Sequence, residues 1–328
     1  MADMLRFRRA STGEQDQVPA RVDDVETPAG EFLTARVVRL EDGTTDGLEL
    51  LQHRPVNGDR RQAGYLRLDN EILAGRRLHE LAGWHGYPPE VTRLYGDEAT
   101  SADPFALFEG PQGEPLREVG EYLDNQSFDR FVAGLLTALC WLAGAGIAHR
   151  GISPDTVTWD IQDGTVQLGD LSRSAPFGAA RTPVGGSWAW VAPESRPDSC
   201  YGTVGPGDDL WAAVRLLYFV RSRGKSLENR GQLAEAGLAQ LFNGMLDAVF
   251  GPPEGRPTAR DLVEHGLRRH HILPSVEDAS KRLVQGRASF LNARARLHPD
   301  APVPPDFWDD ILPARGQRAP GGPPGGAG

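Results

Sequence analysis

The sequence predicts an α+β protein with a small β-rich N-terminal part, a larger helical part and a C-terminal helical extension. Two strand-like apolar runs, 32–40 and 48–53, lie on either side of the turn Asp42-Gly43, as in a β-hairpin. Apolar residues then recur at helical spacing over 65–82. A helix-rich region follows over 127–271, so the two halves of the chain are expected to differ in architecture.

Two further elements follow from apolar runs. Phe105 to Glu109 is predicted to form a buried strand, because four apolar residues precede Glu109 and a glycine follows it. The run from Phe131 to Ala148 carries no charged residue over eighteen positions. A membrane span needs about 20 apolar residues, and this run is interrupted by glycines. We therefore expect a buried helix here rather than a membrane span.

Composition and periodicity divide the chain into five segments. Residues 1–28 are polar and lack periodicity, so we expect a disordered segment. The β-rich part is expected at 29–110 and the helical part at 111–271. Residues 272–312 are predicted to contain a helix and a proline-rich docking segment, and 313–328 to be a disordered Gly/Pro tail.

The predicted C-terminal helix has a seven-residue apolar repeat. Its bulky and small members alternate along one seam, a pattern typical of an amphipathic helix. This helix either packs on the body of its own domain or binds a partner, and Phe307-Trp308 could likewise dock elsewhere or fold back. We expect a protein partner to bind at 274–312. The bulky row is Val276, Leu283, Phe290 and Leu297, and the small row is Ala279, Gly286 and Ala293.

The charge balance narrows the class of partner. The chain has 328 residues and a formal charge of -10, which argues against nucleic acid and anionic lipid as partners. The N-terminus lacks the apolar core of a secretory signal. Cys140 and Cys200 have no metal or redox spacing, so a cytoplasmic location is expected. The sequence does not determine the oligomeric state.

A series of short motifs carries the strongest functional signal. In order, they are His149-Arg150-Gly151-Ile152-Ser153-Pro154-Asp155-Thr156, Gly169-Asp170-Leu171-Ser172, Ala192-Pro193-Glu194, Asp209-Leu210-Trp211 and Arg256-Pro257-Thr258-Ala259. In this order and at these spacings they resemble the eukaryotic-type Ser/Thr protein kinase domain, whose signatures are His-Arg-Asp, Asp-Phe-Gly and Ala-Pro-Glu. The resemblance covers roughly residues 30 to 270. It implies a two-lobed fold with a small β-rich N-lobe and a helical C-lobe.

The resemblance assigns structural roles to five residues. It implies a buried ion pair between Glu194 and Arg256, which ties the activation segment to the C-lobe. It implies that Asp209 holds the backbone of the catalytic loop, with His149 packed beneath it. Arg150 is carried over as a third scaffold position of the same loop. All five residue types that this scaffold requires are present.

The positions that carry chemistry differ from the family pattern. Gly151 stands where the family has the aspartate that accepts the substrate proton, and it has no side chain to do so. Loss of a general base typically costs about 10²–10⁴ in rate. Ser153 replaces the lysine that contacts the transferring phosphate. Thr156 replaces the asparagine that binds a metal ion, and a single hydroxyl is a poorer ligand for a hard cation.

The N-terminal half departs further from the pattern. No lysine occurs before Lys225, so none can hold the nucleotide phosphates. The corresponding position falls at Leu51 or Gln52, and Glu71 loses its usual partner unless His53 or Arg54 reaches it. An arginine would not be equivalent to the lysine. The sequence before Gly47 also lacks a Gly-x-Gly-x-x-Gly phosphate loop.

Asp170 matches the metal-binding aspartate of the family. It either retains a metal ion or caps its own loop by hydrogen bonding to nearby backbone. Asp170, Glu71 and Glu109 would form a vestigial nucleotide cleft. We expect no cofactor and no metal, with residual ATP and Mg²⁺ binding through Asp170 as the alternative. Asp155 is a weak candidate for a substitute base, because the family loop places it toward solvent.

The sequence therefore predicts a pseudokinase, not an enzyme, that acts as a scaffold or allosteric regulator through protein contacts. Two alternatives remain. One is an atypical ATP-dependent transferase or weakly active Ser/Thr kinase that reuses the cleft. The other is a receptor for a small molecule, since Gly151 and the missing lysine make the cleft less polar than that of an active kinase.

Overall fold

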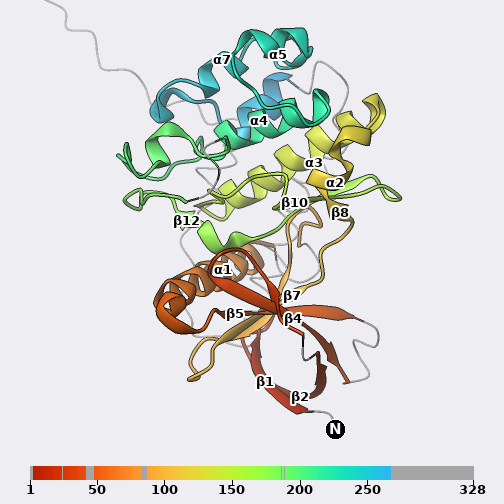
Figure 1. The fold of residues 1–328 in the computed structure, drawn as a ribbon, viewed down its shortest axis with the longest axis vertical. Helices are drawn as coiled ribbons and strands as arrows, with labels where there is room; N and C mark the ends of the chain where they lie inside the picture. Colours follow the sequence, from red (N-terminus) through yellow and green to blue (C-terminus); the bar gives the residue numbers. More distant parts are fainter. Residues whose placement is uncertain are drawn as a thin grey trace, which may run out of the picture.

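The computed structural model describes residues 3–23, 25–41, 48–82, 87–185, 187 and 189–266. Within them the protein has a mixed α+β architecture, with a β-sheet region at the N-terminal end and a helical region above it in Figure 1. The expected C-terminal helix, the docking segment within 272–312 and the tail 313–328 lie outside the described residues.

The N-terminal region is an antiparallel sheet that closes on itself. Its order is β2-β1-β6-β7-β5-β4-β3, and a further pairing joins β2 to β4, so that six strands form a ring. Closure gives each of these six strands a neighbour on both sides, and β1 meets β6 only through Arg8 and Arg9. The strands are β1 Asp3–Arg9, β2 Gln15–Val22, β3 Thr27–Pro28, β4 Leu33–Leu40, β5 Glu49–Pro55, β6 Leu94–Glu98 and β7 Phe105–Glu109.

The prediction of disorder over 1–28 was wrong. This segment contributes β1 and β2, which close the ring between β6 and β4. In β1, Leu5 and Phe7 alternate with exposed arginines, so the strand presents an apolar face inward and a charged face to solvent. Phe7 is fully buried with Val18 of β2 inside the ring. The high charge of the segment concealed this period-two pattern.

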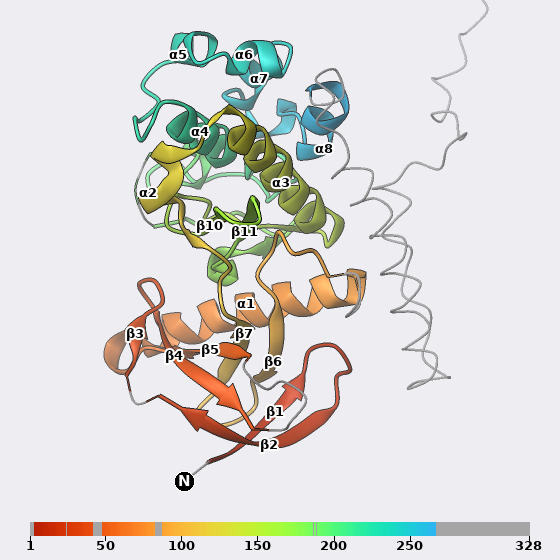
Figure 2. The same ribbon diagram turned by 90° about the vertical axis from the view of Figure 1, so that its right-hand side faces the viewer.

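A long helix covers the sheet. α1, Arg61–Ala82, packs Leu68 and Ile72 against Leu94 of β6 and Phe108 of β7. Gly75 permits the close approach, because a Cβ at this position would lie 2.5 Å from the Cβ of Leu94. Figure 2 shows α1 lying between the strands and the helical region.

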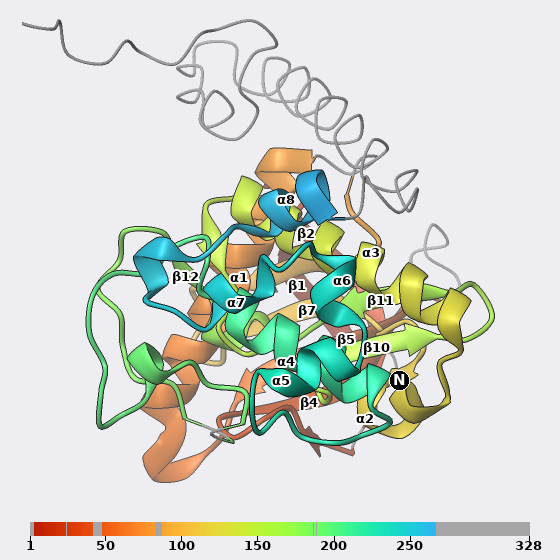
Figure 3. The same cartoon turned by 90° about the horizontal axis from the view of Figure 1, so that it is seen from above.

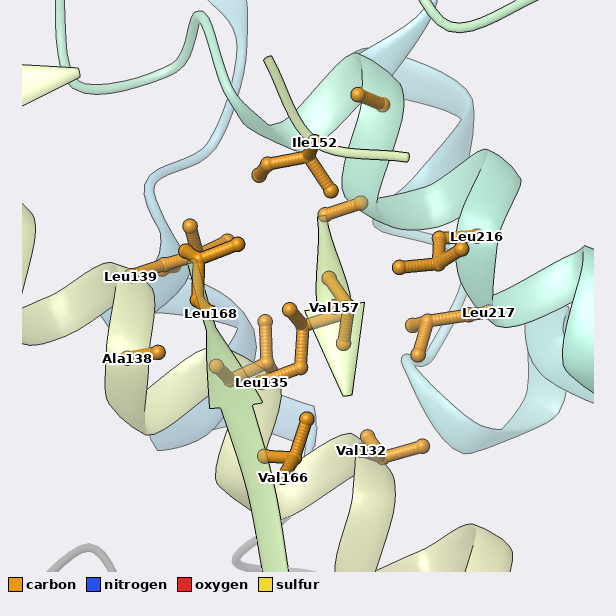
Figure 4. Packing of buried hydrophobic residues seen from close by; sticks show 14 of the residues in the cluster. Val132, Leu135, Ala138, Leu139, Ile152, Val157, Val166, Leu168, Leu216 and Leu217 are labelled. Carbon is orange, nitrogen blue, oxygen red and sulfur yellow. The ribbon is translucent and has the colours of Figure 1, made fainter. Parts of the chain in front are cut away.

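The helical region is organised around two buried helices. α3, Asn125–Gly144, begins at Asp124, whose side chain accepts the Ser127 N–H at 2.8 Å. It is long and apolar enough to cross a membrane, but 67% of its most apolar window is buried, as in the core helix of a folded domain. α4, Leu210–Arg221, packs against it. Figure 4 shows Val132 and Leu135 of α3 facing a cluster that includes Leu216 of α4.

Shorter elements complete the helical region, and Figure 3 views it from above, with α5, α6 and α7 over α4. The helices are α2 Leu116–Val119, α5 Gly231–Glu235, α6 Leu238–Leu241, α7 Leu246–Val249 and α8 Ala259–Asp261. The strands are β8 Glu114–Pro115, β9 Ile147–Ala148, β10 Val157–Asp160, β11 Thr165–Leu168 and β12 Ala175–Pro176. Single turns are η1 Gly58–Arg60, η2 Gly120–Tyr122, η3 Leu171–Arg173, η4 Pro193–Ser195, η5 Pro253–Gly255 and η6 Leu262–Gly266.

The two regions meet where α1 lies on η3. The Asn70 side chain donates a hydrogen bond to the Ser172 carbonyl at 2.9 Å, and the Ser174 hydroxyl donates to the Asn70 carbonyl at 3.3 Å. Residues 169–173 lie at this seam, and the loop 149–156 contacts them through His149 and Gly169, so the candidate site includes both regions.

Candidate functional site

The loop 149–156 is fixed by Asp209 from below. The backbone N–H groups of His149 and Arg150 each donate to the Asp209 carboxylate at 2.7 Å. The buried His149 ring contacts the Gly169 carbonyl at 2.7 Å through Nε2 and accepts the Gly151 N–H through Nδ1. Ile152 inserts into the core cluster drawn in Figure 4. The structure thus brings together His149 and Asp209, as the resemblance implied.

Arg150 links this loop to the segment that follows the metal-loop motif. Its backbone is left-handed, with φ of 61°, an uncommon conformation for a residue with a side chain. Its guanidinium donates to the Thr182 hydroxyl at 3.3 Å and also to the Thr182 carbonyl. Burial lowers the pKa of Arg150. The contact holds residue 182 over the loop.

Two buried ion pairs secure the region 181–256. Arg256 binds Glu194 in a bidentate arrangement at 2.5 and 2.9 Å, with side chains only 1% and 2% exposed. Arg181 binds Asp208 at 2.7 and 3.2 Å and is equally buried. Sequence reasoning found the first pair and missed the second. Asp208 stands beside the motif residue Asp209, but nothing in the sequence indicates which arginine pairs with it.

The space beside Gly151 is occupied by Arg173. A Cβ at position 151 would lie 3.2 Å from Cδ of Arg173, whose guanidinium donates to the Gly185 carbonyl at 2.5 Å. The aliphatic part of the Arg173 side chain therefore lies against position 151, close to where a Cβ would stand. Sequence reasoning missed Arg173, although it follows Asp170-Leu171-Ser172 directly.

The hydroxyl groups of Ser153 and Thr156 form hydrogen bonds with the backbone of their own loop. Thr156 Oγ1 donates to the Gly151 carbonyl at 2.9 Å and accepts the Ser153 N–H at 3.0 Å. Ser153 Oγ accepts the Asp155 N–H at 3.3 Å. The exposed Asp155 carboxylate is held by Arg117. These contacts close the loop, and they turn Asp155 toward Arg117.

Asp170 caps its own turn. Its backbone is left-handed, with φ of 54°, and its carboxylate accepts the Ser172 N–H at 3.3 Å. Of the two interpretations offered for this residue, the contacts match the capping one. Among the described residues, no group of three or more His, Cys, Asp and Glu side chains could hold a metal ion.

Glu71 of α1 is paired with His53 of β5. His53 Nδ1 lies 2.9 Å from Glu71 Oε2, and the two side chains are 15% and 1% exposed. The residue opposite Glu71 is therefore His53, one of the two partners, His53 and Arg54, that the sequence left open. Strand alternation explains why Gln52 is not the partner. The side chain of Gln52 points into the interior of the sheet ring beside Leu50, whereas that of His53 points toward α1. Arg54 instead contacts Asp103 and Glu26.

The two partners have shifted pKa values. Burial opposes the charged form of His53, but the attraction and hydrogen bond of Glu71, with the charge of Asp170, outweigh it and raise the pKa of His53. Burial also raises the pKa of Glu71, and His53 offsets only part of that effect. A titratable imidazole thus takes the place of a permanently charged partner.

The linker from β7 to β8 has its backbone donors already occupied. The Glu109 N–H donates to the Arg93 carbonyl at 3.0 Å, and the Gly110 N–H donates to the Glu49 carbonyl at 3.1 Å. Pro111 has no N–H, and the Gln112 N–H donates to the Gln167 side chain at 3.0 Å. Positions 109–112 therefore offer no free backbone N–H to the acceptor nitrogens of a purine.

The carboxylate of Glu109 pairs with another residue of the protein. Its carboxylate accepts a hydrogen bond from Arg93 at 3.1 Å, and burial raises its pKa. Of the three residues expected to form a vestigial nucleotide cleft, Glu71 and Asp170 lie close enough to interact electrostatically with His53, while Glu109 pairs elsewhere.

A short turn stands where a phosphate loop would be expected. It joins β3 to β4, and Gly30 adopts a φ of 82° within it. The Ala29 N–H donates to the Leu33 carbonyl at 2.9 Å, which closes the turn, and the Phe32 carbonyl accepts the Val56 N–H at 3.0 Å. Arg67 of α1 lies over the Phe32 ring at 5.6 Å from its centroid. The turn is thus packed against the start of α1.

Arg67 is a second cation that sequence reasoning missed. It donates to the Ser172 carbonyl at 3.5 Å from the α1 side. Burial lowers its pKa, and the positive charge of Arg173 lowers it further, while Asp170 acts in the opposite direction. Its position in α1, four residues before Glu71, is the signal that could have placed it on the face that meets the site.

Comparison with curated proteins finds distant homology to Ser/Thr protein kinases. Sperm motility kinase Z of Mus musculus is 26% identical over 196 residues, which is 54% of this chain and 39% of that protein. The SNF-related serine/threonine-protein kinases of Rattus norvegicus and Mus musculus are 23% identical over 188 residues, or 55% of this chain and 24% of theirs. No family model matches the chain. The chain thus spans less than half the length of the curated relatives it matches.

Proposed function

We propose that this protein is a pseudokinase: a protein kinase-like domain of two lobes that does not transfer phosphate and acts through protein contacts, as a scaffold or allosteric regulator in the cytoplasm. The distant homology to Ser/Thr kinases supports the family. The observation that carries the proposal is Gly151, which has no carboxylate to accept the substrate proton and against which the Arg173 side chain lies instead.

Three other features support the loss of phosphotransfer. His53 replaces a permanently charged lysine opposite Glu71. The Thr156 hydroxyl is bound to the backbone of its own loop. The linker 109–112 has no free N–H for a purine. A phosphoryl-transfer site needs a bound nucleotide, positioned phosphates and bridging metal ions. The linker bears on the first requirement, His53 on the second and Thr156 on the third.

The scaffold role is supported by contacts that fix the segment after Asp170. The Arg150–Thr182 contact, the Arg181–Asp208 pair and the Glu194–Arg256 pair hold it at three points. A segment held in this way can present a constant surface to a partner without a catalytic cycle. The expected partner is a protein, and we propose that it binds to the segment 274–312.

The test is a phosphotransfer assay on the full chain with ATP and either Mg²⁺ or Mn²⁺, using wild type and Asp170→Ala. We expect no transfer to a generic Ser/Thr substrate or to the chain itself, and no difference between the two proteins. Mass spectrometry of the same samples should also find no added nucleotidyl group. Transfer that depends on Asp170 would replace this proposal with a weakly active kinase, and an added nucleotidyl group would replace it with an atypical transferase.

A further inference from the structure

A hollow of about 290 Å³ lies between the start of α3 and the end of α4. Phe128 and Val220 are buried in its wall, and Leu123 is partly buried beside them. The rim is polar and carries Arg221 and Arg223. Pockets for free small molecules are commonly about 300–1,000 Å³ and mostly apolar. This hollow therefore suits a few side chains of a polypeptide better than a free ligand.

Arg221 is held in place at the rim by three contacts. Its guanidinium donates to the side-chain oxygen of Asn125 at 2.5 Å and to the Ala236 carbonyl at 3.3 Å. It also lies 5.1 Å from the centroid of the Phe128 ring, a distance typical of a cation–π contact. These partners are neutral, so the side chain is positioned while its positive charge is retained.

Arg223 stands at a backbone position where glycine is usual. Its φ is 57°, and the next N–H, that of Gly224, donates back to the Phe219 carbonyl at 2.8 Å. This is the Schellman arrangement at the end of a helix, whose left-handed residue is most often glycine because a Cβ is unfavourable there. The chain nevertheless has an arginine at this position, and it lines the hollow. Unfavourable backbone conformations of this kind cluster at functional positions.

The charges around the hollow favour a carboxylate ligand. Asp124 is the acidic residue that lines it, and its carboxylate accepts the Ser127 N–H at 2.8 Å as the cap of α3. The two arginines outnumber it, and neither forms an ion pair with another of the described residues. Arginine binds carboxylates through paired, charge-assisted hydrogen bonds. The hollow is therefore suited to an acidic peptide that also carries apolar side chains.

The sequence contains such a peptide outside the described residues. The segment Asp306-Phe307-Trp308-Asp309-Asp310-Ile311-Leu312 combines three aspartates with two aromatic and two aliphatic residues, and it has no basic residue. Pro305 and Pro313 flank it. Proline disfavours a helix in the residue before it and favours an extended chain, which lowers the entropy lost when a peptide binds.

The chain is long enough for this peptide to reach the hollow. The described part ends at η6, which contacts α3. The hollow lies at the first turn of α3, a helix of 20 residues and therefore about 30 Å long. Residues 267–305 would span about 60 Å even if all were helical, and more if extended. Attachment to the same chain also raises the effective concentration of the peptide to about the millimolar range, so a modest contact is sufficient.

We infer that the hollow between α3 and α4 binds the acidic, aromatic segment 306–312 of the same chain. The two adjacent aspartates of the segment pair with Arg221 and Arg223, and its aromatic rings cover the apolar wall. The inference rests on the proposed function for the partner and divides the segment 274–312 into two parts. Residues 306–312 are held on the helical region, and the amphipathic helix that precedes them is left to the partner.

The first test locates the segment in the full chain. The photo-cross-linking residue p-benzoylphenylalanine replaces Phe307, and mass spectrometry identifies the cross-linked peptides. We expect cross-links within one chain, to residues 123–128 and 220–223. Cross-links found only between two chains, or only to other parts of the body, would overturn the inference.

The second test measures affinity with a fluorescently labelled peptide of residues 303–314. It is titrated into the full chain carrying Asp309→Asn and Asp310→Asn, which releases the chain's own segment, and saturable binding is expected. Arg223→Gly in that chain should weaken binding at least about tenfold, as for the loss of a charge-assisted hydrogen bond. Glycine suits the left-handed backbone here, so the melting temperature should not fall. Lys225→Gln is the matched control, because it removes an exposed charge nearby that does not line the hollow, and it should leave affinity unchanged.

Three results of the titration would contradict the inference: no binding of the peptide, equal losses from Arg223→Gly and Lys225→Gln, or equal affinity for wild type and for the chain with both asparagines. Equal losses would mean general attraction of an acidic peptide to a basic surface. Equal affinity would mean that the segment of wild type leaves the hollow free. Failure here is separable from failure of the proposed function. Absence of both docking and phosphotransfer would reject only the contact of 306–312, whereas phosphotransfer dependent on Asp170 would reject the pseudokinase.

Discussion

His53 of β5 and Glu71 of α1 form a buried pair across the sheet–helix boundary, with Nδ1 and Oε2 separated by 2.9 Å. In a kinase-like domain this is the contact that positions the helix against the sheet. Because the cation here is an imidazole, the contact depends on protonation, unlike one made by lysine or arginine.

The first prediction concerns the pH dependence of stability. Folding raises the pKa of His53 above its ordinary value of 6.5, so its contribution is fully present below that pH and is lost as the pH rises through the folded pKa. The raised pKa of Glu71 acts in the same direction, because the folded state again binds the proton more tightly. Urea unfolding should show the free energy of unfolding falling from about pH 6 to about pH 8.

The control separates the two groups. His53→Gln removes one titrating group, but it also removes the offset that His53 exerts on the raised pKa of Glu71. The double variant with Glu71→Gln should therefore be the one that flattens the profile. A double variant with the full wild-type decline would mean that another group is responsible.

The second prediction concerns the ion pair that Glu194 makes with Arg256. Glu194→Gln should lower the free energy of unfolding by about 3–5 kcal/mol, because it leaves a buried guanidinium without its counter-charge. Replacing both partners with methionine should cost less than this single change. Asp155→Asn is the exposed control, since the Asp155–Arg117 pair is more than half exposed and should cost at most about 1 kcal/mol. Equal losses from the buried and the exposed substitution would contradict the argument.

The third prediction tests the closed sheet. Phe7 is fully buried and its ring centroid lies 5.8 Å from that of Tyr95, so Phe7→Ala should cost about 3–5 kcal/mol by denaturant unfolding. Met4→Ala on the same strand should have little effect, because Met4 is 55% exposed. If residues 3–22 were disordered, the two substitutions would be equally silent.

The fourth prediction concerns restoration of the missing carboxylate. Gly151→Asp should not create phosphotransfer, because the new side chain would meet Arg173 and form an ion pair with it. The double variant with Arg173→Ala should also be inactive, since the N-terminal region still lacks the lysine. Transfer of γ-phosphate by either variant would show that the cleft is closer to an active one than proposed.

Much of the architecture was predictable because it is local. The apolar periods that predicted strands at 32–40 and 48–53 and a helix at 65–82 correspond to β4, β5 and α1, with ends shifted by a few residues. Phe105 to Glu109 forms β7 as expected. These patterns are visible in the sequence because a strand or helix repeats its buried side chains at a fixed spacing. The prediction failed over 1–28, because β1 and β2 each place only a few apolar residues on their buried face.

The sequence by itself determined which residue types of the kinase pattern this chain lacks. Gly151 has no side chain, and no lysine precedes Lys225, whatever the fold. Only the tertiary structure decided what occupies the emptied positions: His53 rather than Arg54 meets Glu71, Arg173 fills the space beside Gly151, and Arg181 selects Asp208. The absence of a functional group can be read at one position, whereas the choice of partner depends on strand register and on the packing of segments far apart in the chain.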